Sequence, residues 1–291
     1  MKKLHLVPGL DDIVNGMSAV ARMLVGEQGD AEVVDLRLWK SVIGRDDHEE
    51  VWVHGAWLPS EWRACKRVLK AGARLVRMPH GSYDPVRLGY HGWKKTLVGP
   101  IERFFLRRSS VVVATCEAEK GWIKAYLGKH CPPVEVTDIK RFFNLHPSEI
   151  SGQTLNLTSQ FSSPAQNLSS LRLLYLGRRH PLKGVECLEQ AVKGVNDIEL
   201  RIVSNAFGEE KEKVWEWCDV LVLPTRSENF GLVIAEALER GKRVITTDGA
   251  PAWGDGNDYG GRLIYLKGYR EGTSEARVRL LRDAIKRLQA K

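Results

Sequence analysis

The chain has 291 residues, of which 43% are hydrophobic, and a formal net charge of +8. This hydrophobic content excludes a disordered chain and is enough for one large core or two modest ones, so two domains are predicted. The positive charge suits nucleic acid, an anionic membrane face or a phosphorylated substrate, and it does not choose among them.

The composition also argues against several other classes of protein. No stretch approaches the roughly 20 apolar residues that a membrane-spanning helix needs. The first residues reach Pro8 and two aspartates too soon for the apolar region of a signal peptide, so export is not expected. The five cysteines are scattered without CxxC pairs, and we expect reduced structural thiols.

Short apolar runs alternate with helical stretches along the whole chain, which predicts parallel sheets flanked by helices. Strands are predicted at residues 4–7, 32–35, 51–53, 74–78 and 111–115, and again at 172–176, 199–203, 220–223, 243–246 and 263–265. The predicted domains are residues 1–147 and 171–273, joined by a polar linker at 148–170 and followed by a C-terminal helical segment, 274–291, that can pack back across them. Two such domains would place the carboxyl ends of their strands on either side of one cleft.

In the second half, a buried strand at 220–223 leads through a polar loop into a helix that opens around Gly231. Its free amides, at about residues 230–232, and the positive end of its dipole suit phosphate oxygens. Glu228 and Glu236 bracket this point with seven residues between them, and carboxylates accept hydrogen bonds from ribose or hexose hydroxyls. Taken singly, each carboxylate is better explained as an ordinary helix charge.

A second candidate element is the strand at 173–176, which runs into a basic loop containing Arg178, Arg179 and Lys183. Arginine offers a planar fork for phosphate oxygens and lysine a compact charge, so the loop could neutralise a leaving diphosphate. The alternative is an ordinary exposed basic loop.

These segments carry a resemblance to a known family. The strand followed by GR and then KG, with DVLVLPTRSENFGLVIAEAL further on, resembles the donor-binding half of glycosyltransferase family 4, which comprises retaining enzymes of the GT-B fold. The first half resembles the same family more loosely, in VWVHGAW and MPHGSYDP. The resemblance implies an α/β protein with two Rossmann-like parallel-sheet domains facing a central cleft, the first on the acceptor side and the second binding a nucleotide sugar.

The resemblance also implies roles for individual residues. Arg178 and Lys183 would stabilise the departing diphosphate, Glu236 would hold the ribose hydroxyls, and Glu228 would hold hydroxyls of the transferred sugar. His80 would lie near the donor sugar, with a buried or turn histidine as the alternative. The implied catalytic residues are Arg178, Lys183, Glu228 and His80, and the implied donor-binding residues are Gly16, Arg178, Lys183, Glu228, Asn229, Phe230, Gly231, Leu232 and Glu236.

The implied reaction is a metal-independent, retaining transfer of a hexosyl group without a cofactor, from a UDP-sugar as first choice or a GDP-sugar as second. The acceptor would be a glycan or a lipid-linked molecule in polysaccharide or lipopolysaccharide biosynthesis, and the protein would be cytoplasmic, at the inner face of the cytoplasmic membrane. A basic segment interleaved with aromatic residues comprises Trp93, Lys94, Lys95, Arg103, Phe104, Phe105, Arg107 and Arg108. It either contacts anionic lipid or forms a solvated helix face.

Three other functions were weighed against this one. A weakly active or non-catalytic sugar-nucleotide-binding protein stays open, because the chain between Val203 and Trp215 is shorter than in relatives and the base preference is not predicted. A nicotinamide-dependent enzyme is disfavoured because no GxGxxG follows the first strand. Nucleic-acid binding is not expected because no binding motif accompanies the charge.

Overall fold

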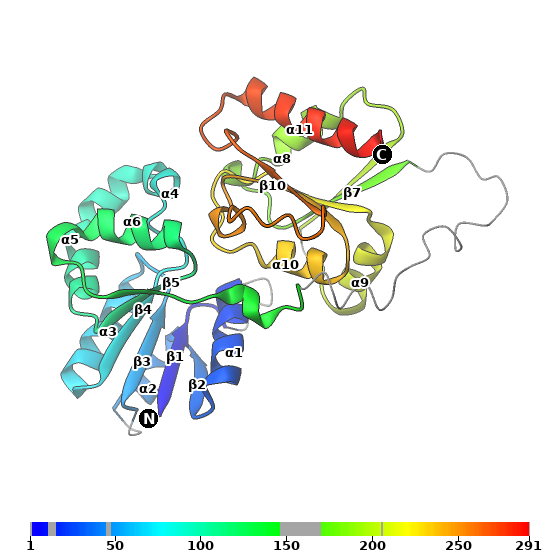
Figure 1. Cartoon of the computed structure of the whole chain (residues 1–291). Helices are drawn as coiled ribbons and strands as arrows, with labels where there is room; N and C mark the ends of the chain where they lie inside the picture. The colour runs from blue at the N-terminus through cyan, green and yellow to red at the C-terminus, as the bar shows by residue number, and fades with distance from the viewer. Residues whose placement is uncertain (1, 11–15, 45–47, 146–169, 205, 291) are drawn as a thin grey trace. The chain divides into compact units, whose positions relative to one another are not determined.

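The computed structural model describes residues 2–10, 16–44, 48–145, 170–204 and 206–290. The chain divides into two compact units, Met1–Phe142 and Phe143–Lys291, each with its own sheet and helices (Figure 1). The predicted linker at 148–170 lies outside the described residues apart from Ser170.

The first unit is built on a six-stranded sheet in the order β2-β1-β3-β4-β5-β6, with every pair parallel. Its strands are β1 (Lys3–Val7), β2 (Ala31–Asp35), β3 (Glu50–His54), β4 (Arg74–Met78), β5 (Val111–Ala114) and β6 (Val134–Val136). Five of them lie where the sequence predicts. The edge strand β6 was not predicted, because three residues after two prolines are too short to show a strand period.

Helices connect these strands: α1 (Gly16–Gln28), α2 (Trp39–Val42), α3 (Pro59–Ala71), α4 (Pro85–Gly89), α5 (Gly92–Arg107) and α6 (Glu117–Leu127), with short 3₁₀ turns at Leu36–Leu38, Gly128–His130 and Ile139–Phe142. The local sequence explains α3 well. Proline occupies its first position, the Glu61 side chain accepts from the backbone N–H of Leu58, and Gly72 ends the helix in the left-handed conformation.

Successive side chains of β1 and β3 point to opposite faces of this sheet, and the two faces differ in polarity. Leu4 and Leu6 of β1 and Val51 and Val53 of β3 belong to an apolar cluster that also includes residues of α3. The intervening positions of the same strands carry His5, Trp52 and His54, and their rings lie against one another. Both faces of a parallel sheet are usually apolar, so a buried face with two histidines is an exception.

The second unit has a five-stranded parallel sheet in the order β11-β10-β9-β7-β8. Its strands are β7 (Leu171–Leu176), β8 (Ile198–Val203), β9 (Val220–Leu223), β10 (Arg243–Thr247) and β11 (Leu263–Leu266), and its helices are α8 (Val185–Val192), α9 (Gly208–Trp217), α10 (Leu232–Glu239) and α11 (Ser274–Gln289), with 3₁₀ turns at Pro181–Lys183 and Pro251–Trp253. The closing helix α11 packs against α8, and the Arg282 guanidinium donates to the carbonyl oxygens of Gln190 and Ala191 at 2.8 and 2.9 Å.

The strand order of each sheet reverses direction at one point, between β1 and β3 in the first unit and between β7 and β9 in the second. In open parallel sheets, ligands bind beyond the carboxyl ends of the strands at such a switch point. The predicted α/β architecture of two parallel-sheet domains is confirmed. The strand order predicts a ligand site at the carboxyl edge of each sheet, next to its switch point.

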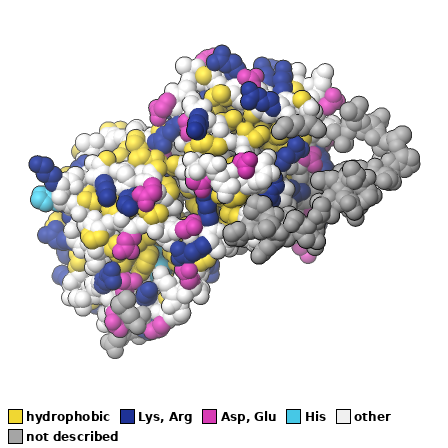
Figure 2. Space-filling view, viewed as in Figure 1, with side chains coloured by type: hydrophobic (Ala, Val, Ile, Leu, Met, Phe, Trp, Pro, Cys, Tyr) yellow, Lys and Arg dark blue, Asp and Glu magenta, His cyan; other side chains and the backbone are white. Residues whose placement is uncertain are grey.

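Two surface features bear on the predictions of no membrane span and of a positive charge. No helix in the described ranges is both long enough and apolar enough to cross a bilayer. On the face drawn in Figure 2, Lys and Arg side chains are interspersed with Asp, Glu and hydrophobic ones.

Candidate active site

The two loops predicted to bind the donor lie side by side at the switch point of the second sheet. The loop after β7 carries Arg178 and Lys183, and the loop after β9 carries Glu228. Because β7 and β9 are hydrogen-bonded neighbours, both loops leave the same edge of the sheet. The strand order thus brings together two motifs that are separated by 45 residues in the chain.

The side chains of Lys183 and Glu228 form an ion pair across these two loops. They are 18% and 16% exposed, so the pair is partly shielded from water but still reachable by a ligand. Burial, and then the negative charge of Glu228, raise the pKa of the nearby Tyr175 above its ordinary value. An ammonium and a carboxylate at one switch point can serve a phosphate and a sugar hydroxyl respectively.

Backbone hydrogen bonds hold the two loops at a fixed separation. The carbonyl oxygen of Leu182 accepts from the backbone N–H of Arg226 at 2.7 Å and from the hydroxyl of Thr225 at 3.1 Å. At Gly184, which has a φ of +69°, a Cβ atom would lie 2.1 Å from the carbonyl oxygen of Pro224. Only glycine fits at that position, since the backbones of the two loops approach too closely for any side chain.

A third loop supports Glu228. Its backbone N–H donates to the carbonyl oxygen of Gly249, after β10, at 2.7 Å. A Cβ atom at Gly249 would lie 2.1 Å from the carbonyl oxygen of Thr225, so this glycine is also required by close packing. Sequence reasoning missed Thr225 and Gly249, and glycine in the run GAPAW was the only signal that could have found the second.

Helix α10, which follows the loop after β9, begins as predicted. Gly231 caps α10 in the left-handed conformation, with a φ of +75°, and Leu232 is the first helical residue. The Phe230 side chain is 3% exposed and packs against Trp253 with the two rings tilted, so this residue can offer a ligand only its backbone. The backbone N–H of the neighbouring Asn229 donates to the Glu228 carboxylate at 3.1 Å.

Glu236 lies in the second turn of α10 and is held by a residue that sequence reasoning did not single out. The Nζ atom of Lys211, on α9, lies 2.8 and 2.7 Å from the two carboxylate oxygens of Glu236. Lys211 falls in the charged run GEEKEK, which reads as a solvated helix face, so nothing local distinguishes it. The short segment between β8 and β9 therefore contributes a cation beside the predicted ribose ligand.

The two arginines of the basic loop differ in their surroundings. Arg179 forms an ion pair with Glu189 at 2.5 Å, which turns its charge toward α8. The Arg178 side chain is exposed, and its carbonyl oxygen accepts from the Tyr175 hydroxyl at 2.8 Å. Arg178 is thus the arginine of this loop that remains available for a diphosphate.

The remaining predicted site residues, Gly16 and His80, belong to the first unit. Gly16 is the exposed first residue of α1, while residues 11–15 before it lie outside the described part of the chain. His80 follows β4, is 5% exposed, and has a left-handed backbone with a φ of 52°, which is uncommon outside glycine. Its Nε2 atom lies 2.8 Å from Nδ1 of His54.

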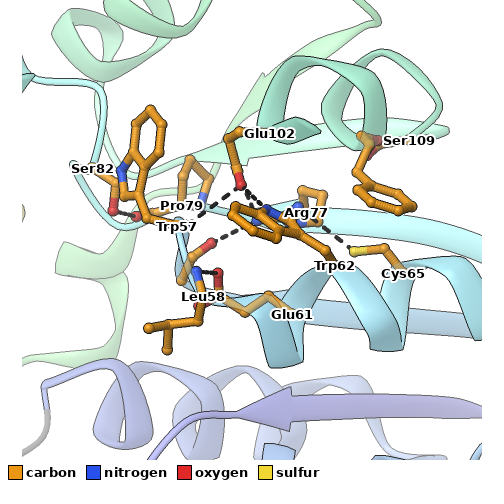
Figure 3. Close-up of polar contacts among 12 residues, drawn as sticks. Trp57, Leu58, Glu61, Trp62, Cys65, Arg77, Pro79, Ser82, Glu102 and Ser109 are labelled. Carbon is orange, nitrogen blue, oxygen red and sulfur yellow. Dashed lines mark hydrogen bonds and ion pairs between the residues drawn. The ribbon is translucent and has the colours of Figure 1, made fainter. Parts of the chain in front are cut away.

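A buried ion pair on the other face of this sheet organises the loop after β3 (Figure 3). Arg77 and Glu102 are fully buried, and their Nη2 and Oε1 atoms lie 3.1 Å apart. Glu102 also accepts hydrogen bonds from the Trp62 indole and, at 2.5 Å, from the Tyr83 hydroxyl, while Arg77 donates to the Gly55 carbonyl oxygen at 2.9 Å. Arg77 and Glu102 therefore each have polar partners in addition to one another, as a buried ion pair requires.

Glu61 lies beside this network as a third buried carboxyl group. Burial raises the pKa of Glu61 to about 8. Its Oε2 atom accepts from the Leu58 backbone N–H at 3.0 Å, whereas its Oε1 atom has no hydrogen-bond partner within the described part of the chain. Burial of the uncharged carboxyl group costs less than burial of a carboxylate, which is the reason for the raised pKa.

The basic, aromatic segment predicted around residues 93–108 is mostly helix α5, and its cations divide into two sets. Arg103 and Arg107 donate to the carbonyl oxygens of Tyr126 and Leu127 at 3.3 and 2.8 Å, which directs them toward α6. Lys95 donates to the Tyr90 carbonyl oxygen at 3.0 Å. Lys94 and Arg108 stay exposed, as do Trp93 and Phe104, whereas Phe105 is buried.

The described residues contain no cluster of three or more His, Cys, Asp or Glu side chains arranged to hold a metal ion. The loop after β7 brings two predicted phosphate ligands, Arg178 and Lys183, to this edge of the second sheet.

Comparison with known proteins agrees with this architecture. The family described as Glycosyl transferase 4-like domain matches residues 14–139, and the family described as Glycosyl transferases group 1 matches residues 160–283. A search of curated proteins gives no match.

Several solved structures share the fold at low sequence identity. Sucrose-phosphate synthase from Thermosynechococcus elongatus is 14% identical with a TM-score of 0.69, over 100% of this chain and 90% of that chain. Anabaena HepE in complex with UDP-glucose is 16% identical with a TM-score of 0.63, over 99% and 91% of the two chains. The lipopolysaccharide outer core galactosyltransferase WaaB, in its apo form, is 14% identical with a TM-score of 0.58, over 98% and 90%.

Identities of this size establish a common fold and do not transfer a substrate. The two family matches, by contrast, cover one parallel-sheet unit each, and the second includes every residue of the β7 and β9 loops that was predicted to bind the donor. The chain therefore belongs to the GT-B glycosyltransferases of the group 1, GT4-type family.

Proposed function

We propose that the protein is a retaining glycosyltransferase that moves a hexosyl group from a nucleoside-diphosphate sugar to a glycan or lipid-linked acceptor. The observation that carries the proposal is the pairing of Lys183 with Glu228 at the switch point of the second sheet, with Arg178 on the same loop as Lys183. A diphosphate at this point would compete with Glu228 for Lys183, which frees the carboxylate to accept from sugar hydroxyls.

The proposed division of roles follows from the positions of these side chains. Arg178 and Lys183 would neutralise the charge that grows on the departing diphosphate, and this favours the transition state over the bound donor. Glu236 would bind the ribose hydroxyls, and Lys211 would keep its carboxylate ionised and oriented. The two cations also make a divalent metal unnecessary in this proposal, with the leaving phosphate helping to deprotonate the acceptor hydroxyl.

A UDP-sugar is the proposed donor, and a GDP-sugar is the second choice. Structural relatives support this order, because HepE has been solved with UDP and with UDP-glucose. Cell-surface polysaccharide or lipopolysaccharide biosynthesis is the proposed pathway, supported by the likeness to the lipopolysaccharide galactosyltransferase WaaB.

The first experiment is a thermal-shift and donor-hydrolysis screen of the purified protein against UDP, GDP and their common sugar conjugates, with and without EDTA. One nucleotide should stabilise the protein, and the shift should disappear in Lys183→Ala and Glu236→Ala. Lys193→Ala, at an exposed lysine after α8, is the control that should behave as the wild type. No shift with any nucleotide would refute the donor site, whereas binding without transfer to any acceptor would favour a sugar-nucleotide-binding protein.

Contact with an anionic membrane is a further part of the proposal and concerns one face of α5. Trp93 and Leu97 are 66% and 71% exposed, and Ile101 and Phe104 continue the same stripe at helical spacing. A groove of about 580 Å³ beside this stripe is bordered by Lys66, Lys70 and Arg108. Apolar side chains flanked by cations are typical of a helix lying in the headgroup region of an anionic bilayer.

Vesicle flotation tests this contact directly. The protein should float with vesicles containing phosphatidylglycerol and stay behind with pure phosphatidylcholine, and Leu97→Glu should abolish flotation. Lys124→Gln, which lowers the net charge by the same single unit at an exposed site on α6, controls for net charge. Equal flotation of the wild type and Leu97→Glu would remove α5 from the proposal.

A further inference from the structure

Four polar side chains form a continuous hydrogen-bonded line through the buried face of the first sheet. Oε1 of Gln28, the last residue of α1, lies 3.0 Å from Nε2 of His5 on β1. Nδ1 of His5 lies 3.0 Å from Nε2 of His54 on β3, and Nδ1 of His54 lies 2.8 Å from Nε2 of His80. This line, which we call the histidine relay, crosses the switch point between β1 and β3 and ends at His80, just after β4.

Burial keeps all three imidazoles neutral. His5 and His54 are completely buried, and His80 is 5% exposed. Desolvation lowers the pKa of His5 to about 4 and that of His80 to about 3, and it also lowers the pKa of His54 well below its ordinary value. A neutral imidazole has one N–H donor and one lone-pair acceptor, so each ring of the relay must donate in one direction and accept from the other.

The amide of Gln28 sets the direction of the whole relay. Its Oε1 atom accepts, so Nε2 of His5 carries the proton and Nδ1 of His5 is an acceptor. Nε2 of His54 must then donate to His5, and by the same reasoning Nε2 of His80 must donate to His54. Nδ1 of His80 is left as a lone pair, and it has no hydrogen-bond partner among the described residues.

The backbone presents this last ring at the ligand-binding edge of the sheet. His80 and Gly81 both have left-handed backbones, with φ angles of 52° and 73°. The N–H of Gly81 donates to Oε1 of the buried Glu119 at 2.5 Å, which holds the turn in place. A non-glycine residue in this conformation costs roughly 1 to 3 kcal/mol, and such strain is concentrated at functional sites.

We propose that Gln28, His5 and His54 are positioning residues that hold His80 as the Nε2–H tautomer, so that its Nδ1 atom accepts a hydrogen bond from a sugar hydroxyl at the carboxyl edge of the first sheet. This inference rests on the proposed glycosyltransferase function and narrows the role of His80 within it. In this tautomer the ring has no N–H at its free edge, so His80 accepts a hydrogen bond from the sugar there and does not donate one.

Nitrogen-15 NMR of histidine-labelled protein tests the tautomers without any assay of activity. Two-bond correlations distinguish a protonated ring nitrogen from a lone-pair nitrogen at each histidine. The relay predicts a protonated Nε2 and an unprotonated Nδ1 for His5, His54 and His80 alike. A protonated Nδ1 at His80 would overturn the inference, whatever the protein binds.

Variants of the half-buried Gln28 separate positioning from a merely structural role. Gln28→Glu keeps an acceptor oxygen and should preserve the wild-type tautomers, whereas Gln28→Met removes it and should give His80 a mixture. In Gln28→Met the KM for the sugar substrate that contacts His80 should rise about three- to tenfold, as expected for one lost hydrogen bond, with the Kd for the free nucleoside diphosphate unchanged. Wild-type tautomers in Gln28→Met would refute the role of Gln28, and an absence of nucleotide binding in the wild type would refute the proposed function instead.

Discussion

The ion pair between Lys183 and Glu228 allows a quantitative test of the donor site. Two unit charges about 4 Å apart attract each other by about 4 kcal/mol at an effective dielectric constant of about 20. The side chains are 18% and 16% exposed, so solvent screens part of this energy, although less than at fully exposed pairs, which contribute about 0.2 to 1 kcal/mol. We expect a coupling free energy of about 1 to 2 kcal/mol between the two side chains in the free protein.

A double-mutant cycle measures this coupling. The free energy of unfolding is determined by urea titration for the wild type, Lys183→Met, Glu228→Gln and the double variant, first without ligand and then with the stabilising nucleotide diphosphate. The nucleotide should reduce the coupling, because its phosphate oxygens compete with Glu228 for Lys183. A coupling below about 0.3 kcal/mol without ligand, or one that a bound nucleotide leaves unchanged, would refute the reasoning.

Three further predictions concern packing, protonation and the ribose ligand. Gly184→Ala should lower the free energy of unfolding by about 2 to 5 kcal/mol, because the new Cβ would lie 2.1 Å from a backbone carbonyl oxygen and the φ of this residue is positive. The control is Gly194→Ala, where φ is +74° but the space is open, and it should cost about 1 kcal/mol. Urea titration measures both. Glu61→Gln should gain stability relative to the wild type as pH rises from about 4.5 to about 8, by up to about 1.4 kcal/mol per pH unit, because the folded state keeps a proton there that the unfolded state loses. Lys211→Met should raise the Kd for the nucleotide in calorimetry about three- to tenfold, because Glu236 loses the cation that orients it.

Each of these predictions has a result that would contradict it. Equal losses of stability at Gly184 and Gly194 would mean that the loops after β7 and β9 relax apart without penalty. Parallel pH profiles for the wild type and Glu61→Gln would mean that the buried carboxyl group titrates normally. An unchanged nucleotide Kd in Lys211→Met would mean that Glu236 is oriented without its lysine.

Much of the fold was predictable because its signals are local. Parallel strands that are buried on both faces appear as short apolar runs, and ten of the eleven strands were placed in this way. The helix that starts after Gly231 was recognisable from a glycine cap and the apolar run behind it. The strand β6 was missed because three half-exposed edge residues show neither a period nor an apolar run.

The candidate site was predictable only in part, because side chains acquire their partners from distant elements. Lys183 and Glu228 were identified as separate charges, but nothing in either loop indicates that the two side chains meet. Lys211 gave no signal, since lysine in a charged helical run is usually a solvated residue. His80 was singled out from its own motif, and its hydrogen bond to His54 was not predicted.

The sequence by itself determined the alternation of strands and helices, the placing of one carboxylate in a loop and the other in the helix that follows, and the glycines where backbones approach closely. Each of these features depends on residues that are near one another in the chain. The tertiary structure alone decided which loops share an edge of a sheet. Lys183 meets Glu228 across 45 positions and His5 meets His54 across 49, because β7 lies next to β9 and β1 next to β3. Strand order depends on the packing of helices over both faces of the sheet, and the periodicity of any single strand contains no information about it.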